Sequence, residues 1–327
     1  MFHTAASQGN RWWFDSPFLR SFSKNRLIAS IASFKLNGPV GIRHTDIRLS
    51  PADAFRFFII RDLQGGGMRI KIDLNSDVGE SFGNYKIGLD EEVIPLISSA
   101  NIACGFHAGD PEVMRTTVSL AARSGVAVGA HPGLPDLMGF GRRAMDVTLQ
   151  EIKDYVTYQV GALQAVAKSQ GVQLQHVKPH GALYNMAVQK PEIWEAVAEA
   201  VAAVHPGLIL FALAGPDRAD LEAMGQRLGI RIGFEFFGDR AYNSDGSLVS
   251  RKLPGAVIHD QDQVAEKILM LVKEGTVSCV DGTEIALKAD TICVHGDNPS
   301  ALALVRKIRK TLESAGVDIA PVRDFLK

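Results

Sequence analysis

The sequence predicts an α/β protein built as a TIM-like (β/α)7 barrel, and two patterns support this prediction. From residue 68 onward, short apolar runs alternate with amphipathic segments, which is the pattern of βα units with a parallel sheet. About seven such units within roughly 260 residues favour closure into a barrel. A doubly wound open sheet is the alternative. In either fold, ligands bind at the carboxyl ends of the strands, so candidate functional residues are sought there.

Each element has its own signal. Asp110 and Asn298 each precede a proline, the arrangement of an N-cap before a helix. Thr148 and Glu151 have the spacing of a capping box, and Gly171 is placed to end the helix that they begin. The expected strands are the apolar runs 70–74, 101–103, 126–130, 175–177, 208–212, 231–235 and 291–294.

Residues 1–67 differ from the rest of the chain. Their aromatic residues follow no sustained helical or strand period, and Asp15 is the only acidic residue between Trp12 and Ile42. A transit peptide, a small extra domain, or a biological start at Met68 would each account for this. We favour the start at Met68 and expect 1–67 to be a disordered or non-native extension, with 68–327 as a single barrel domain.

Composition excludes several classes of protein. The chain has 327 residues with 35 Lys and Arg against 36 Asp and Glu, so it lacks the basic excess of a nucleic-acid-binding protein. No apolar run reaches the roughly 18 residues of a membrane helix. Three widely spaced cysteines form no CxxC pair, which fits a reducing cytoplasm. We expect a cytoplasmic enzyme that acts on a small molecule.

Ionisable and polar residues gather where the predicted strands end. Four histidines in these segments stand next to or near glycine, which permits tight turns and close approach of a ligand. One carboxylate and two imidazoles, Asp77, His107 and His180, would suit a divalent metal, although a metal-free hydrogen-bonded network is the alternative. The candidates are Asp73, Asn75, Asp77, Glu80, His107, His131, Arg142, Arg143, Lys178, His180, Asp239, Arg240 and His295.

Several of these segments together form longer motifs. Residues 73–83, 99–111 and 176–185, followed by 139–143, 239–242 and 293–297, resemble the LamB/YcsF family, whose members form the A component of 5-oxoprolinase (ATP-hydrolysing). The resemblance runs from Met68 to near the C-terminus and covers none of 1–67; Gly238 stands where we would expect alanine. It implies a seven-stranded barrel similar to the glycoside hydrolase/deacetylase superfamily. It also implies ATP-dependent cleavage of 5-oxo-L-proline to L-glutamate, with the B and C components of the same enzyme as partner subunits.

This implied reaction assigns roles to the candidates. A lactam has a poor leaving group, and phosphorylation of its oxygen by ATP would give an activated imidate that water attacks. Such a site needs a base, here Asp73, Asp77 or His107, and cations near the phosphate, here Lys178 with Arg142 or Arg143. No GxxxxGK[ST] motif is present, so ATP binds either through an unfamiliar loop or on the partner subunits.

For several candidates, a purely structural role is the alternative to a functional one. Glu80 is a ligand carboxylate or a first-turn helix charge, His131 a substrate contact or a loop histidine, and Asp239 and Arg240 site residues or mutual partners. Two other functions remain as alternatives: a metal-dependent deacetylase of an acylated sugar, and a non-catalytic regulatory subunit. The number of ionisable groups at strand ends argues against the regulatory role.

Overall fold

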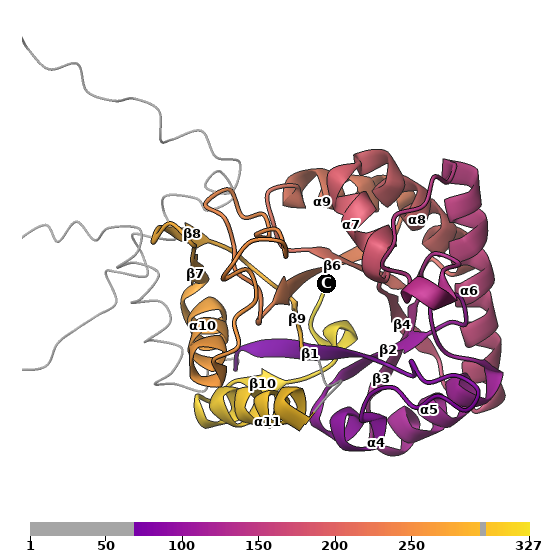
Figure 1. Cartoon of the computed structure of the whole chain (residues 1–327), viewed down its shortest axis with the longest axis horizontal. Helices are drawn as coiled ribbons and strands as arrows, with labels where there is room; N and C mark the ends of the chain where they lie inside the picture. The colour runs from indigo at the N-terminus through magenta and orange to yellow at the C-terminus, as the bar shows by residue number, and fades with distance from the viewer. Residues whose placement is uncertain (1–68, 295–298) are drawn as a thin grey trace, which may run out of the picture. The chain divides into compact units, whose positions relative to one another are not determined.

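The computed structural model describes residues 69–294 and 299–327 (Figure 1). The chain divides into two units, Met1–Gly67 and Met68–Lys327. The expected N-terminal extension, residues 1–67, lies outside the described residues, as do His295 and the expected N-cap Asn298.

The second unit is built on a closed parallel barrel, which confirms the predicted fold and excludes the open sheet. Within the described residues, β9 pairs with both β6 and β1, so that the sheet closes on itself. Cys293 is aligned with Phe237 on one side and with Asn75 on the other. The barrel strands are β1 (Lys71–Val78), β2 (Ser99–Ala103), β3 (Ala127–His131), β4 (Leu174–Val177), β5 (Ile209–Leu213), β6 (Arg231–Phe237) and β9 (Thr291–Cys293).

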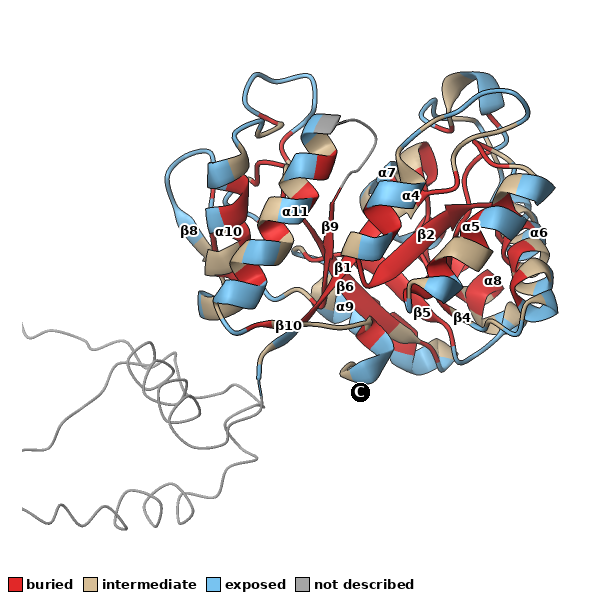
Figure 2. Cartoon of the chain, turned by 90° about the horizontal axis from the view of Figure 1, so that it is seen from below, coloured by how far each residue is buried: buried red, intermediate tan, exposed pale blue. Residues whose placement is uncertain are grey.

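Helices surround the barrel, and their buried sides face the strands while their outer sides are exposed (Figures 1 and 2). The α-helices are α4 (Asp90–Val93), α5 (Pro111–Arg123), α6 (Leu149–Ser169), α7 (Gly181–Gln189), α8 (Pro191–Val204), α9 (Arg218–Leu228), α10 (Gln261–Glu274) and α11 (Pro299–Ser314). The predicted Asp110 cap and the Thr148–Glu151 capping box are both present. None of the described helices combines the length and apolarity needed to cross a membrane.

Short elements complete the unit. The 3-10 turns are η1 (Ile94–Leu96), η2 (Leu137–Gly139) and η3 (Val322–Asp324), and β7 (Thr276–Ser278) pairs with β8 (Glu284–Ala286) as an antiparallel ribbon. β10 (Asp318–Ile319) joins β1 at its first residues. Val322 then packs with Ile209 and Phe211 at the beginning of β5, so the C-terminal segment adds apolar side chains at the amino end of the strands.

One boundary prediction was wrong in a way that affects the site. β1 was expected to end at residue 74, but it continues to Val78, so Asp77 lies inside the strand and not in a following loop. Polar residues interrupt the apolar pattern of this strand, and periodicity alone therefore ended it early. Side chains alternate along a strand, so Asp73, Asn75 and Asp77 all point to the same side. Their hydrogen bonds to residues of β2 and β9 place that side inside the barrel.

Candidate active site

The centre of the site is the ammonium group of Lys178, which follows β4 and is almost completely buried. Its Nζ lies 2.9 Å from Oδ1 of Asp77 and 2.9 Å from Oε1 of Glu235. It also lies 3.2 Å from Oδ1 of Asn75 and 3.2 Å from Sγ of Cys293. Burial works against the charge, but Asp77, Cys293 and Glu235 outweigh it and hold the pKa of Lys178 well above its usual value. Lys178 is therefore a fixed cation, and it is not a proton acceptor at neutral pH.

A buried amide network positions the two groups from β1 that contact this ammonium. Nδ2 of Asn101 donates to Oδ1 of Asn75 at 2.7 Å and to Oδ1 of Asp77 at 2.8 Å. The imidazole of His176 donates from Nε2 to Oδ1 of Asn101 at 2.7 Å, and its ring stacks on Phe211 at 4.1 Å. Burial lowers the pKa of His176 to about 3, so it stays neutral and serves as a support. Asn101 thereby fixes the orientation of the Asp77 carboxylate.

Asp73 lies deeper in the barrel than the Lys178 centre. Its carboxylate accepts hydrogen bonds from the hydroxyls of Ser98 at 2.6 Å, Ser99 at 2.7 Å and Thr291. Burial raises its pKa to about 6, even though these hydroxyls act in the opposite direction. No described hydrogen bond or ion pair joins Asp73 to Lys178 or to a histidine. The structure thus separates Asp73 from the other predicted catalytic residues.

Beside the Lys178 centre is a cluster of three histidines and one glutamate. Each of Glu80, His107, His131 and His180 offers one ligand atom within 4.8 Å of the others, and the three histidines are buried. Oε1 of Glu80 lies 3.7 Å from Nε2 of His107 and 3.9 Å from Nδ1 of His180. Asp77 borders this cluster through Oδ2, which lies 3.2 Å from Nε2 of His131. Of the predicted set Asp77, His107 and His180, the two histidines lie in this cluster with Glu80 and His131, and Asp77 lies at its border.

Backbone carbonyls fix the tautomers of two of these histidines. Nδ1 of His131 lies 2.7 Å from the carbonyl oxygen of Lys178, and Nε2 of His180 lies 2.8 Å from that of Phe140. A carbonyl oxygen can only accept, so both of these nitrogens carry hydrogen. The other nitrogens, Nε2 of His131 and Nδ1 of His180, face each other at 2.9 Å with their lone pairs. Two lone pairs at this distance repel each other, and a metal ion bound between them would turn the contact into a favourable one.

His107 completes the cluster with two ring nitrogens that are buried and have no hydrogen-bond partner among the described residues. Its ring stacks on His180 with 3.7 Å between centroids and an angle of 2°. Burial, with the neighbouring His131, lowers its pKa well below the usual value. Glycines permit this packing, since a Cβ on Gly133 or on Gly141 would approach the His107 side chain to 2.6 Å. Close packing on His107 thus explains the glycines at positions 133 and 141.

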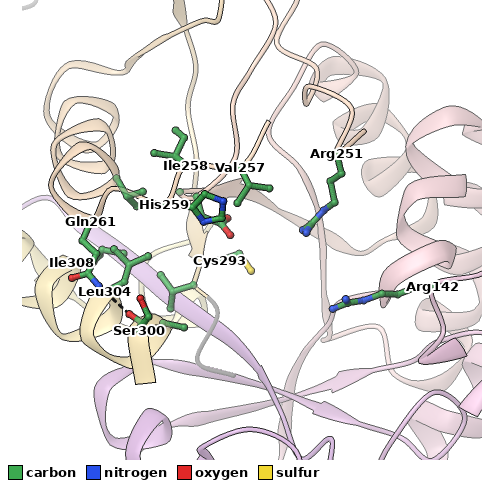
Figure 3. Close-up of a pocket in the computed structure, with 15 residues that line it drawn as sticks. Arg142, Arg251, Val257, Ile258, His259, Gln261, Cys293, Ser300, Leu304 and Ile308 are labelled. Atoms are coloured by element: carbon green, nitrogen blue, oxygen red, sulfur yellow. Dashed lines mark hydrogen bonds between the residues drawn. The ribbon is translucent and has the colours of Figure 1, made fainter. Parts of the chain in front are cut away.

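The structure separates the two predicted phosphate-binding arginines. Arg143 is paired with the carboxylate of Asp136, which lies in the turn just before η2 and also accepts from the backbone N–H of Gly139. It is thus engaged within its own loop. Arg142 instead lines a cavity of about 240 Å³, together with Asp239, Arg251 and Cys293 (Figure 3). Of these two arginines, Arg142 lines this cavity and Arg143 does not.

Arg240 is not brought to the site, although it was predicted as a candidate. Its guanidinium donates to the backbone carbonyls of Val249 at 2.6 Å and Ala256 at 3.3 Å, and the side chain is largely buried. It therefore supports the segment between β6 and α10. Asp239 remains at the cavity, and the predicted site residue His295 lies outside the described residues.

Four residues of this region were not predicted: Asn101, Glu235, Arg251 and Cys293. Asn101 and Glu235 lie in the interior of β2 and β6, where a polar residue between apolar neighbours was an available signal. Cys293 is the last residue of β9 and was undistinguished among the three cysteines. Arg251 lies in an irregular segment, and no pattern in the sequence marks it.

The fold is a parallel β/α barrel, and its buried ionisable groups lie near the carboxyl ends of the strands. Enzymes of the β/α-barrel class have their active sites at this end of the barrel. The family model described as LamB/YcsF family matches residues 72–327. The chain belongs to the LamB/YcsF family.

Similar proteins cover the same part of the chain. It is 54% identical over 257 residues to the 5-oxoprolinase A subunit of Pyrococcus abyssi, covering 79% of this chain and 100% of the relative. It is 52% identical over 254 residues to that of Bacillus subtilis, covering 78% and 98%. The crystal structure of the lactam utilization protein from Thermus thermophilus matches with a TM-score of 0.72 and 47% identity, covering 76% of this chain and 99% of that one.

Proposed function

We propose that this chain is the A component of an ATP-hydrolysing 5-oxoprolinase that cleaves 5-oxo-L-proline to L-glutamate together with the B and C components. The names of the relatives from Pyrococcus abyssi and Bacillus subtilis support the activity and the multi-subunit assembly. The observation that carries the proposal is the buried Lys178 ammonium between Asp77 and Glu235, because a fixed cation at a barrel mouth suits a reaction that develops negative charge on oxygen.

The proposed chemistry balances with one ATP and two water molecules. The lactam oxygen attacks the γ-phosphorus, the bond to ADP breaks, and ADP leaves. Water adds to the activated carbon and gives a proton to a base; the ring C–N bond then breaks, and the nitrogen takes a proton to become the amine. The resulting acyl phosphate is hydrolysed by the second water to glutamate and inorganic phosphate.

Four residues around the Lys178 centre have a part in this scheme: Lys178, Asp77, Asp73 and Asn75. Lys178 stabilises the charge on the lactam oxygen or on the transferred phosphoryl group. Asp77 accepts the proton of the attacking water, since it is the carboxylate that borders both Lys178 and the histidine cluster. Asp73 and Asn75 act as positioning residues, because their contacts are with other groups of the barrel interior.

The histidine cluster fits a divalent metal ion. Glu80, His107, His131 and His180 offer nitrogen and carboxylate ligands, and both tautomer-fixed histidines have the carbonyl partner typical of metal-ligating imidazoles. The two unpartnered buried nitrogens of His107 also favour an ion. When bound, such a metal would supply Lewis-acid polarisation of an oxygen atom. This set includes Glu80 and His131 in place of Asp77, which is engaged with Lys178.

The cysteines support a cytoplasmic location. Cys104, Cys279 and Cys293 are not joined by disulfide bonds, and all three are buried. Free thiols persist in a reducing compartment, as the cytoplasm is.

The proposal is tested by measuring glutamate formation from 5-oxoproline with the purified chain, alone and reconstituted with the B and C components, with and without ATP. We expect ATP-dependent glutamate from the complex and at least a hundredfold loss with Lys178→Met. Release of acetate from acylated sugars without ATP would replace the proposal with a deacetylase. Full turnover of complexes carrying Lys178→Met and Asp77→Asn would instead indicate a regulatory role.

A further inference from the structure

The cavity of about 240 Å³ lies directly beside the Lys178 centre. Cys293 belongs to both, because it lines the cavity while its Sγ lies 3.2 Å from Nζ of Lys178. In Figure 3, Arg142 and Arg251 extend into the space near Cys293 from separate segments, and His259 lies on the opposite side. A ligand whose reacting group lies at Lys178 would therefore have its remaining part within reach of these arginines.

Within the described part of the chain, Arg142 and Arg251 are cations without carboxylate partners. No ion pair joins either guanidinium to a carboxylate among these residues, whereas the neighbouring Arg143 is paired with Asp136. Arg240, which is also nearby in sequence, donates to two backbone carbonyls. Of these four arginines, the two that lack such engagements are the two that line the cavity.

The position of Arg142 depends on a strained turn. Phe140 is a non-glycine residue with a positive φ of 54°, a conformation that is unfavourable for a bulky side chain. This turn directs the Phe140 carbonyl to Nε2 of His180, and the Phe140 ring lies 5.1 Å from the Arg142 guanidinium carbon. The strained residue thus makes two contacts, one through its carbonyl oxygen with His180 and one through its ring with Arg142. These contacts link the orientation of Arg142 to the histidine cluster.

The acidic residue of the cavity does not cancel this positive charge. The negative charge of Asp239 favours the protonated forms of Arg240 and Lys267, and so opposes the lowering of each pKa by burial. Burial lowers the pKa of Lys267 only to about 8, so this lysine is largely charged at neutral pH. Asp239 thus has cationic neighbours of its own, and among the described lining residues Arg142 and Arg251 outnumber this one carboxylate.

We infer that Arg142 and Arg251 form an oxyanion-binding pair for one of the two reactants, holding either a phosphoryl group of ATP or the carboxylate of 5-oxoproline. Guanidinium groups bind both kinds of oxyanion through paired, charge-assisted hydrogen bonds. This inference rests on the proposed function for the identity of the reactants. It adds Arg251 as a binding residue, and it assigns Arg142 to a defined cavity.

Binding is measured by calorimetry on the full chain with three separate probes: inorganic phosphate, ATP with magnesium, and 5-oxoproline. Arg142→Gln and Arg251→Gln are each expected to weaken the bound oxyanion about tenfold, and Arg251→Lys to weaken it less. Lys252→Gln is the matched control, since it removes an exposed positive charge next to Arg251 and is expected to change affinity less than twofold. Arg142 and Arg251 are both exposed, so their glutamine variants should have the same melting temperature as the unmodified chain.

The three probes separate the two sources of oxyanion. Weaker binding of phosphate and ATP alone assigns the pair to the nucleotide, and weaker binding of 5-oxoproline alone assigns it to the substrate carboxylate. The inference is overturned if the unmodified chain binds none of the probes, if both glutamine variants bind as it does, or if Lys252→Gln has an equal effect. If arginine-dependent binding of phosphate is found but the complex forms no glutamate, the proposed function fails and the oxyanion site stands.

Discussion

The Lys178 ammonium lies 2.9 Å from Oε1 of Glu235, a carboxylate whose side chain has no exposed surface. Two further oxygens, from Asp77 and Asn75, surround the same nitrogen. Removing such groups from water costs several kcal/mol for each ion, and a hydrophobic set of the same volume is often at least as stable. We interpret this buried charge cluster as a functional requirement of the site, retained despite that cost.

Replacing Lys178 with methionine should lower both stability and activity, and a second substitution should then restore part of the stability alone. The variant leaves Asp77 and Glu235 buried without their cation, so the free energy of unfolding should fall by about 3–5 kcal/mol. Adding Glu235→Gln should recover part of this stability but none of the turnover. Chemical denaturation and the reconstituted assay measure the two quantities. A Lys178→Met variant with unchanged stability would contradict the arrangement described here.

The histidine cluster should bind about one equivalent of a divalent metal. Metal content of the purified chain, measured by mass spectrometry after incubation with zinc or manganese and gel filtration, should drop when His107 or His180 is replaced by alanine. Added metal should raise the melting temperature of the unmodified chain but not of these variants, because a ligand bound only to the folded state stabilises it. His205→Ala, an exposed histidine outside the cluster, is the control. Equal metal content in all four proteins would count against the site.

Asp73 should give the protein an unusual dependence of stability on pH. Its pKa in the folded state is about 6, above the usual value of 3.8, so the folded state binds the proton more tightly than the unfolded state. Lowering the pH from 7 to 5 should therefore stabilise the unmodified chain by about 1 kcal/mol relative to Asp73→Asn. Urea unfolding at several pH values checks the difference. Parallel curves for the two proteins would show that this carboxyl group is not perturbed.

Gly129 should not tolerate a methyl group. A Cβ at this position in β3 would lie 2.1 Å from Nε2 of His176, the atom that donates to Asn101. Gly129→Ala should lower the free energy of unfolding by at least about 2 kcal/mol, as expected for overpacking. Gly161→Ala is the matched control, because Gly161 lies in α6 with open space around it. This control should gain about 0.5–1 kcal/mol from the higher helix propensity of alanine. Thermal unfolding of both variants tests the contrast.

Much of the site could be predicted from the sequence because barrel geometry brings the ends of parallel strands together. Asp77, His107 and the neighbouring residues Lys178 and His180 come from three distant parts of the chain, and each was predicted from its place near a strand end. The same reasoning did not foresee where Asp73 and Arg240 lie, since a position near a strand end does not reveal depth in the barrel or the direction of a side chain. Asp73 lies below the Lys178 centre, and Arg240 turns to backbone carbonyls.

The sequence by itself determined the alternating order of strands and helices, the helix caps at Asp110 and Thr148, and the set of ionisable groups near the strand ends, and it favoured a barrel over an open sheet. These features depend on local periodicity and short-range hydrogen bonds, which are written in neighbouring residues. Tertiary structure decided which groups pair: Lys178 with Glu235, Arg143 with Asp136, and Glu80 and His131 with the other histidines. Except for Arg143 and Asp136, which share one loop, these pairings join segments that are distant in the chain, and they depend on the depth and direction of side chains that only the closed barrel fixes.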